Sequence, residues 1–134
     1  MHPAYEKAHA STGTVIGAAI EVHRIMGPGL LESIYEKCLV RELELRRIPV
    51  QRQVVIPIEY KGFTFQEPLR VDLYVAGCLA VELKAVEQVA PIEHAKLLSY
   101  MKLLDAPIGL LINFHQSVLK EGIRRRVLKG ADKP

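Results

Sequence analysis

Two neighbouring stretches of the chain alternate between apolar and polar positions, which is the pattern of strands that bury one face. Ala76-Gly77-Cys78 separates them and predicts a three-residue turn in which Val75 pairs with Leu79. The same register sets Asp72 opposite Glu82. The pattern predicts a hairpin with one buried and one solvated face, the buried face carrying Leu69, Val71, Leu73, Val75, Leu79, Val81, Leu83 and Ala85.

Three helices are predicted from apolar residues that recur three and four positions apart. The first runs from Thr14 to Met26 and ends at Gly27-Pro28-Gly29. The second begins at Leu30 or Leu31 and ends at Arg46, with a buried stripe made of Leu31, Ile34, Tyr35, Cys38, Leu39 and Leu43. The third follows Pro91 and runs from Ile92 or Glu93 to Leu104.

Further strands are indicated on both sides of the hairpin. Residues 53–60 read as a strand whose Pro57 argues for an edge position or a bulge. The nearly unbroken apolar run from Gly109 to Phe114 predicts a strand covered on both faces. Val118 to Leu128 fits either a strand or a helix, and we expect a frayed tail after Lys129.

Size and composition predict one soluble domain that spans residues 1–134, with its core at about 14–128. The chain has 134 residues, of which 49% are hydrophobic and 25% charged, and no apolar stretch long enough for a membrane helix. The first residues lack the features of a signal peptide, so we expect a cytoplasmic protein. Cys38 and Cys78 are too few and too far apart for a disulfide framework or a paired-cysteine zinc site.

The charge pattern offers a second candidate surface. The net charge of +3 is a mild excess, but Arg124, Arg125 and Arg126 lie together between Lys120 and Lys129. Such a cluster either follows a phosphate backbone or is only a solvated surface.

Asp72 and Glu82 are the most informative residues of the chain. Two carboxylates that face each other across a hairpin repel unless one is protonated or a cation lies between them. A divalent cation that prefers oxygen ligands would relieve this repulsion. The alternative is an ordinary hairpin with a charged, solvated face.

The order of these blocks resembles the PD-(D/E)XK nuclease superfamily and, more narrowly, the GxxExxY protein family. The resemblance rests on Gly29-Leu30-Leu31-Glu32-Ser33-Ile34-Tyr35, Val71-Asp72-Leu73, Val81-Glu82-Leu83-Lys84-Ala85, the helix from His94 to Lys102 with Tyr100, and residues 109–114. It covers roughly Thr14 to Leu128. It implies a restriction-endonuclease-like α/β core, with a central mixed sheet flanked by helices.

The resemblance also implies a site. Asp72 and Glu82 would hold Mg²⁺ or Mn²⁺, Lys84 would orient or help deprotonate the attacking water, and Glu32 would reach in from its helix. Lys84 acts as a base only where its pKa is depressed. Glu32 also has a plainer interpretation, as a helix N-terminal residue favoured by the macrodipole.

One position departs from the family pattern, because Lys96 stands where relatives commonly have glutamine. Lys96 and Tyr100 share a helix face that we expect to look toward the carboxylates. An ammonium there either binds substrate phosphate or lowers the pKa values of Asp72 and Glu82 and weakens metal binding. Tyr100 is otherwise a core aromatic residue, as is Tyr35, and His94 is a cap or surface residue.

The sequence therefore predicts a metal-dependent nuclease that hydrolyses phosphodiester bonds of DNA or RNA. A catalytically inactive module of the same fold, which binds nucleic acid or a protein partner, is the alternative, and hydrolysis of a small phosphodiester is a third. The substrate-binding candidates are Lys96, Tyr100, Arg124, Arg125 and Arg126. Whether two copies form a homodimer stays open.

Overall fold

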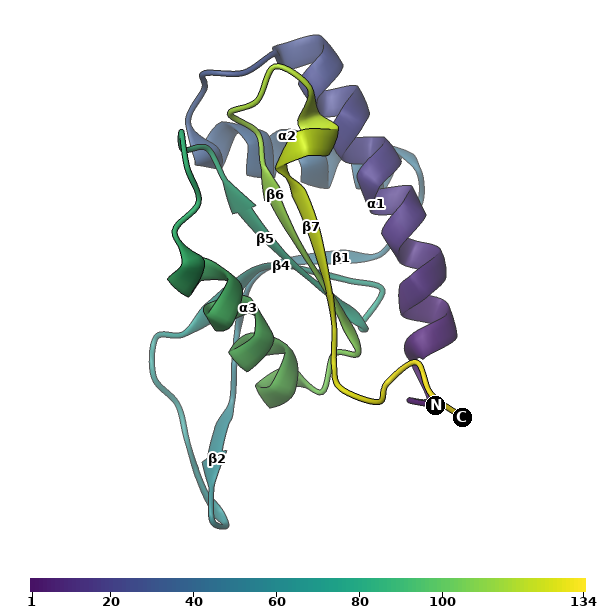
Figure 1. Cartoon of the computed structure of the whole chain (residues 1–134), viewed down its shortest axis with the longest axis vertical. Helices are drawn as coiled ribbons and strands as arrows, with labels where there is room; N and C mark the ends of the chain where they lie inside the picture. The colour runs from purple at the N-terminus through teal and green to yellow at the C-terminus, as the bar shows by residue number, and fades with distance from the viewer.

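A five-stranded mixed sheet lies between helices in the computed structural model, which describes residues 1–134 (Figure 1). This arrangement is the mixed α/β sheet with flanking helices that the sequence predicts. In chain order the elements are α1 (Tyr5–Met26), α2 (Glu32–Leu45), β1 (Val50–Val55), β2 (Ile58–Tyr60), β3 (Phe63–Phe65), β4 (Arg70–Val75), β5 (Leu79–Lys84), α3 (Pro91–Leu104), β6 (Ile108–Asn113), the 3₁₀ turn η1 (Leu119–Gly122) and β7 (Ile123–Val127).

The strand order in the sheet is β1-β4-β5-β6-β7. The β4–β5 hairpin has the predicted register, with Val75 opposite Leu79. β5 and β6 are parallel and are joined through α3, whereas the other pairs are antiparallel. All six residues of β6 are buried, as the apolar run predicts for an inner strand.

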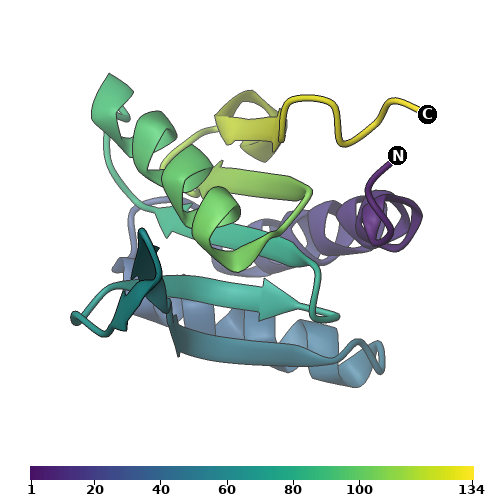
Figure 2. The ribbon, with the colours of Figure 1, turned by 90° about the horizontal axis from the view of Figure 1, so that it is seen from below.

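The helices cover both faces of the sheet (Figure 2). α1 and α2 pack on the face that carries Leu73 and Leu83, whereas α3 packs through Leu97 and Met101 on the other face. An added Cβ at Gly109 would lie 2.5 Å from the sulfur of Met101, so the missing side chain lets α3 approach β6 closely. The close approach of α3 brings the N-terminal residues of that helix to the end of β5.

The even-numbered face of the hairpin is not the solvated surface that the alternation predicts. Ala80 is fully buried under α3, and Asp72 and Glu82 are only partly exposed. The prediction was wrong because the pattern of two strands does not reveal that a distant helix packs on their polar face. The two carboxylates are therefore held where solvation is poor.

The strand predicted for residues 53–60 is two strands that separate at Pro57. β1 ends at Val55 and is an edge strand of the large sheet, which agrees with the position inferred from the proline. β2 pairs only with β3, and Lys61 and Gly62 form their turn with positive φ angles. This second hairpin projects away from the sheet (Figures 1 and 2).

The helices differ from the prediction at their N-terminal ends. α1 begins at Tyr5 instead of Thr14, because Ala8 and Thr12 extend its buried stripe toward the N-terminus. Leu31 is 70% exposed and not buried, because it precedes the first turn of α2 and points away from the core. No helix is both long and apolar enough to cross a bilayer.

The C-terminal segment contains both a 3₁₀ turn and a strand, which explains why its pattern fits neither type alone. The expected frayed tail is partly wrong. Ala131 is buried, and its carbonyl accepts a hydrogen bond from the backbone N–H of His2 at 2.9 Å. The two ends of the chain therefore lie side by side (Figure 1).

Candidate active site

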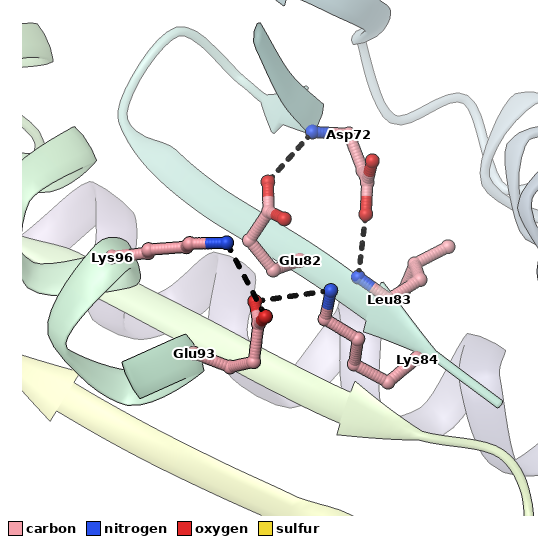
Figure 3. A network of polar contacts seen from close by, with 6 residues as sticks. All are labelled: Asp72, Glu82, Leu83, Lys84, Glu93 and Lys96. Carbon is pink, nitrogen blue, oxygen red and sulfur yellow. Dashed lines mark hydrogen bonds and ion pairs between the residues drawn. The ribbon is translucent and has the colours of Figure 1, made fainter. Parts of the chain in front are cut away.

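Asp72 and Glu82 interlock where the β4–β5 ladder stops (Figure 3). The backbone N–H of Asp72 donates to Oε1 of Glu82 at 2.9 Å, and the backbone N–H of Leu83 donates to Oδ2 of Asp72 at 2.8 Å. Each carboxylate thus binds the main chain of the opposite strand. These reciprocal bonds fix the two side chains next to each other, as the predicted register requires.

The close approach of two poorly solvated carboxylates perturbs both of them. Burial and the neighbouring charge of Asp72 raise the pKa of Glu82 to about 8, although the Asp72 N–H and Lys84 act in the opposite direction. Burial also raises the pKa of Asp72, against the hydrogen bonds from Leu83 and Gln53. At neutral pH without a cation, the pair therefore retains a proton.

Lys84 belongs to a short chain of ion pairs that ends at α3 (Figure 3). Its Nζ lies 3.1 Å from Oε2 of Glu93, and Nζ of Lys96 lies 3.4 Å from Oε1 of the same carboxylate. Burial alone would lower the pKa of Lys84, but Glu93, Glu32 and Glu82 together raise it above its ordinary value. Lys84 is therefore an ammonium group, and this state argues against its predicted role as a base.

Lys96 does not contact the carboxylate pair. It shares a helix face with Tyr100, as predicted, but it pairs with Glu93 and is about half exposed. Burial raises the pKa of Tyr100, and the charge of Glu82 adds to this effect. The Tyr100 hydroxyl group is therefore protonated and lies within electrostatic range of the carboxylate pair. The expected lowering of the pKa values of Asp72 and Glu82 by Lys96 is not seen: burial dominates and raises both values, and Lys96 pairs with Glu93 instead.

Glu32 reaches the same site from the first turn of α2. Burial raises its pKa, and the charge of Asp72 adds to this effect while Lys84 opposes it. One turn further along the helix, Glu36 accepts hydrogen bonds from Arg52 at 2.8 Å and from Gln53 at 2.5 Å. Gln53 also donates to Oδ1 of Asp72 at 3.3 Å, which ties β1 to the carboxylate pair.

Tyr35 explains why Glu32 stands at this place. Its hydroxyl group donates to the carbonyl of Gly27 at 2.5 Å and accepts the N–H of Leu30 at 3.0 Å, and its ring stacks on Phe114 at 4.4 Å. Tyr35 is the fully buried core residue with a bonded hydroxyl group that the sequence predicts. It fixes the turn between α1 and α2 and thereby the start of α2.

The three C-terminal arginines do not form one patch. In β7, Arg124 lies opposite Leu111 and Arg126 opposite Gly109, which places both on the α3 face. Arg126 contacts Nδ1 of His94 at 3.2 Å. Arg125 points to the other face and contacts the hydroxyl group of Tyr5 and Nδ1 of His9 in α1. Strand alternation separates residues that are adjacent in the sequence.

The donor set at Asp72 and Glu82 fits a hard divalent cation. Two partly buried carboxylates that repel each other favour a positive ion between them. No three histidine, cysteine, aspartate or glutamate side chains gather as a metal-binding group. Mg²⁺ commonly retains several waters and needs only one or two protein carboxylates, so a pair of ligands is sufficient.

Three residues of the site, Glu36, Gln53 and Glu93, were not singled out in the sequence. Glu36 is one helical turn from Glu32, a spacing that was available as a signal. Gln53 becomes visible only when β1 is paired with β4, and alternation alone does not give that pairing. Glu93 lies in the first turn of α3, but nothing in its surroundings in the sequence indicates that it contacts Lys84.

Comparison with known proteins gives one family match, to the sequence model described as PD-(D/E)XK nuclease superfamily, which covers residues 9–126. With the mixed sheet and its flanking helices, this match confirms the predicted restriction-endonuclease-like fold. No curated protein matches the chain. A solved structure described as SSO0001 is similar, with a TM-score of 0.47 and 19% sequence identity. The similarity covers 70% of this chain and 47% of that one, so the chain spans about half of its length.

Replacing Glu82 with glutamine should stabilise the metal-free protein increasingly as the pH rises from about 4.5 to about 8. A raised pKa in the folded state favours folding below the unfolded value of 4.5, and this stability is lost as the pH rises through about 8. Glutamine preserves the acceptor for the Asp72 N–H without acquiring a charge. We expect the melting temperature of Glu82→Gln to match wild type near pH 5 and to exceed it by roughly 2–8 °C at pH 8.5.

Thermal melts in a chelating buffer across this pH range measure the difference. Glu67→Gln, which replaces an exposed glutamate, is the matched control and should show no such trend. A difference between Glu82→Gln and wild type that does not vary with pH would mean that Glu82 is already ionised in the folded protein.

Proposed function

Because the chain belongs to the PD-(D/E)XK nuclease superfamily, we propose that it hydrolyses phosphodiester bonds of nucleic acid with Mg²⁺ or Mn²⁺. The observation that carries this proposal is the interlocked pair of Asp72 and Glu82 beside the ammonium group of Lys84. Nucleases of this superfamily typically use divalent metals, and the charge of the pair is that of a cation site. Asp72 and Glu82 are the proposed ligands.

A bound divalent cation would polarise the substrate phosphate and lower the pKa of a bound water molecule. Lys84 holds a fixed positive charge beside the carboxylates, where it stabilises the negative charge that develops on the phosphate. Glu93 keeps Lys84 protonated and orients it through the 3.1 Å ion pair. Glu32 adds a carboxyl group of raised pKa that feels the charges of Asp72 and Lys84 without contacting either, and this group can accept a proton from the attacking water.

Lys96 and Tyr100 are the proposed substrate contacts on α3. Lys96 is half exposed and bound only to Glu93, so its ammonium group is available to a phosphate oxygen. Tyr100 remains protonated and offers a hydroxyl donor. Of the two roles that the sequence left open for Lys96, the structure favours phosphate binding, because its contact with Glu93 keeps it from the carboxylate pair.

A catalytically inactive module that binds nucleic acid or a protein partner is the second candidate. It is favoured by the hydrogen bonds that already occupy oxygens of both carboxylates and by the lack of a third acidic or histidine ligand grouped with them. In that case the pair serves only to join β4 to β5. Divalent metal would then neither bind nor support turnover.

Several finer assignments are part of the proposal. Within the superfamily we place the chain in the GxxExxY family, on Gly29, Glu32 and Tyr35. We propose that residues 1–134 act as one domain in the cytoplasm. A homodimer is compatible with this proposal but is not required for it.

Mn²⁺ binding should depend on both carboxylates of the pair. We expect isothermal titration calorimetry to show a site that Asp72→Asn weakens at least about tenfold, because the variant loses one of two charged ligands. The affinity should rise with pH up to about 8, as the proton on Glu82 is displaced. Glu67→Gln should bind like wild type. Equal binding by Asp72→Asn and wild type would rule out the metal site.

The kinetic constants kcat and KM should distinguish the role of Lys84 from that of Lys96. In a cleavage screen of DNA and RNA with Mn²⁺, Lys84→Ala should lower kcat by at least about 100-fold, because it removes a charge used in the transition state. Lys96→Gln should raise KM several-fold at nearly constant kcat. A loss of kcat in Lys96→Gln as large as in Lys84→Ala would make Lys96 a catalytic residue, and hydrolysis of model diesters alone would indicate a small substrate.

Polymer affinity should depend on the arginines of the α3 face. Each phosphate contact releases counterions, so the double variant Arg124→Gln, Arg126→Gln should bind more weakly and lower the slope of log affinity against log salt by roughly 1–2. Arg125→Gln is the matched control, since Arg125 faces α1, and its slope should equal that of wild type. The opposite ranking would place the nucleic acid on the α1 face. Fluorescence anisotropy at several salt concentrations measures these slopes.

A further inference from the structure

A polar pocket of ≈ 330 Å³ opens on the α3 face and shares no lining residue with the carboxylate pair or the ion pairs of Lys84. Its walls come from the β5–α3 connection, the start of α3, the end of β6 and the segment from η1 to β7. Its polar lining comprises Glu87 and Gln88 from the β5–α3 connection, His94 from α3, and Gln116, Glu121 and Arg124 from the chain that follows β6. Leu111 and Val89 are the two apolar residues of its lining.

The pocket adjoins the proposed catalytic centre. Asn113, which lines the pocket, is the register partner of Lys84 on the neighbouring strand. Its side chain bonds the N–H and the carbonyl of Val86, at 3.1 and 2.8 Å, and so holds the β5–α3 connection in place. His94 directly follows Glu93, the partner of Lys84. A group in this pocket would therefore be adjacent to a phosphate bound at Lys84.

The side chains of this pocket have hydrogen-bonding capacity that the protein does not use. The side chains of Glu87, Gln88, Gln116 and Glu121 make no hydrogen bond or ion pair within the chain, although the backbone carbonyl of Gln116 accepts one from His23. Arg124 donates only to two backbone carbonyls. Amides and carboxylates at a common opening provide both donors and acceptors.

The charges of the lining favour a neutral polar ring over a phosphate. Two carboxylates, Glu87 and Glu121, face one guanidinium group, that of Arg124. Burial, followed by the charges of Arg126 and Arg124, lowers the pKa of His94, so its imidazole is neutral. Since Nδ1 of His94 accepts from Arg126, its Nε2 carries the proton and is a donor. A nucleobase has an apolar face for Leu111 and Val89 and a polar edge for the amides.

We propose that this pocket binds one unstacked nucleobase of the substrate strand, next to the phosphate at Lys84. The inference rests on the proposed nuclease function and narrows its substrate to single-stranded or frayed nucleic acid. A base paired within a duplex cannot present its Watson–Crick edge to a pocket, and unpairing it costs free energy. DNA and RNA share the chemistry recognised here.

Two glutamines make a sharp test, because their side chains are bound to nothing else in the chain. We would titrate ¹⁵N-labelled protein, in EDTA, with the four deoxynucleoside 5′-monophosphates and then with an oligonucleotide as a single strand and as a blunt duplex. We expect saturable shifts of the Gln88 and Gln116 side-chain amides and tighter binding of the single strand. The double variant Gln88→Ala, Gln116→Ala should lose about three- to tenfold in affinity for the single strand only.

Gln51→Ala, which removes an exposed glutamine from the edge strand β1, is the matched control and should bind like wild type. Shifts confined to other surfaces, equal binding of single strand and duplex, or an unchanged affinity of the double variant would each overturn the inference. Because the titration contains no metal, it is independent of turnover. Cleavage activity without shifts of the Gln88 and Gln116 amide signals would contradict only the proposed base-binding pocket. Amide shifts in a protein that never cleaves nucleic acid would support the pocket and contradict the proposed nuclease function.

Discussion

The structure depends on how two like charges are held together at the point where β4 and β5 part. Asp72 and Glu82 each accept a hydrogen bond from the main chain of the other strand, so moving either carboxylate would leave a backbone N–H without a partner. Partial burial makes this arrangement unfavourable when both groups are ionised. The folded protein is therefore more stable when a proton or a cation is bound at this carboxylate pair. The other charged residues of the site surround this pair.

Three elements that are distant in sequence meet at that place for separate reasons. Tyr35 fixes the start of α2 and brings Glu32 to Asp72. The absence of a side chain at Gly109 lets α3 approach β6, so that Glu93 reaches Lys84. The result combines carboxylates of raised pKa with an ammonium group of raised pKa. A site of this kind suits hydrolysis at a polyanion, where both a cation and fixed positive charge are needed.

The sequence predicted what depends on local periodicity and missed what depends on packing between distant elements. The β4–β5 register followed from alternation and turn length, and with it the pairing of Asp72 and Glu82. The run of three arginines was taken as one cluster, because the sequence did not settle whether residues 118–128 form a strand or a helix. The structure shows a strand, which places Arg124 and Arg125 on opposite faces. The contact between Glu93 and Lys84 needs the crossover through α3, and the link from Glu36 to Asp72 needs β1 beside β4. Neither pairing leaves a periodic signal.

The central claim is that the Asp72–Glu82 pair is a cation site that serves phosphodiester hydrolysis. Anomalous diffraction from a crystal soaked in Mn²⁺, at a pH above 8, tests it most directly. The account predicts a peak within bonding distance of a carboxylate oxygen of both residues, at Mn²⁺ concentrations that support cleavage. A protein that cleaves nucleic acid at those concentrations without a peak at this pair would contradict the account.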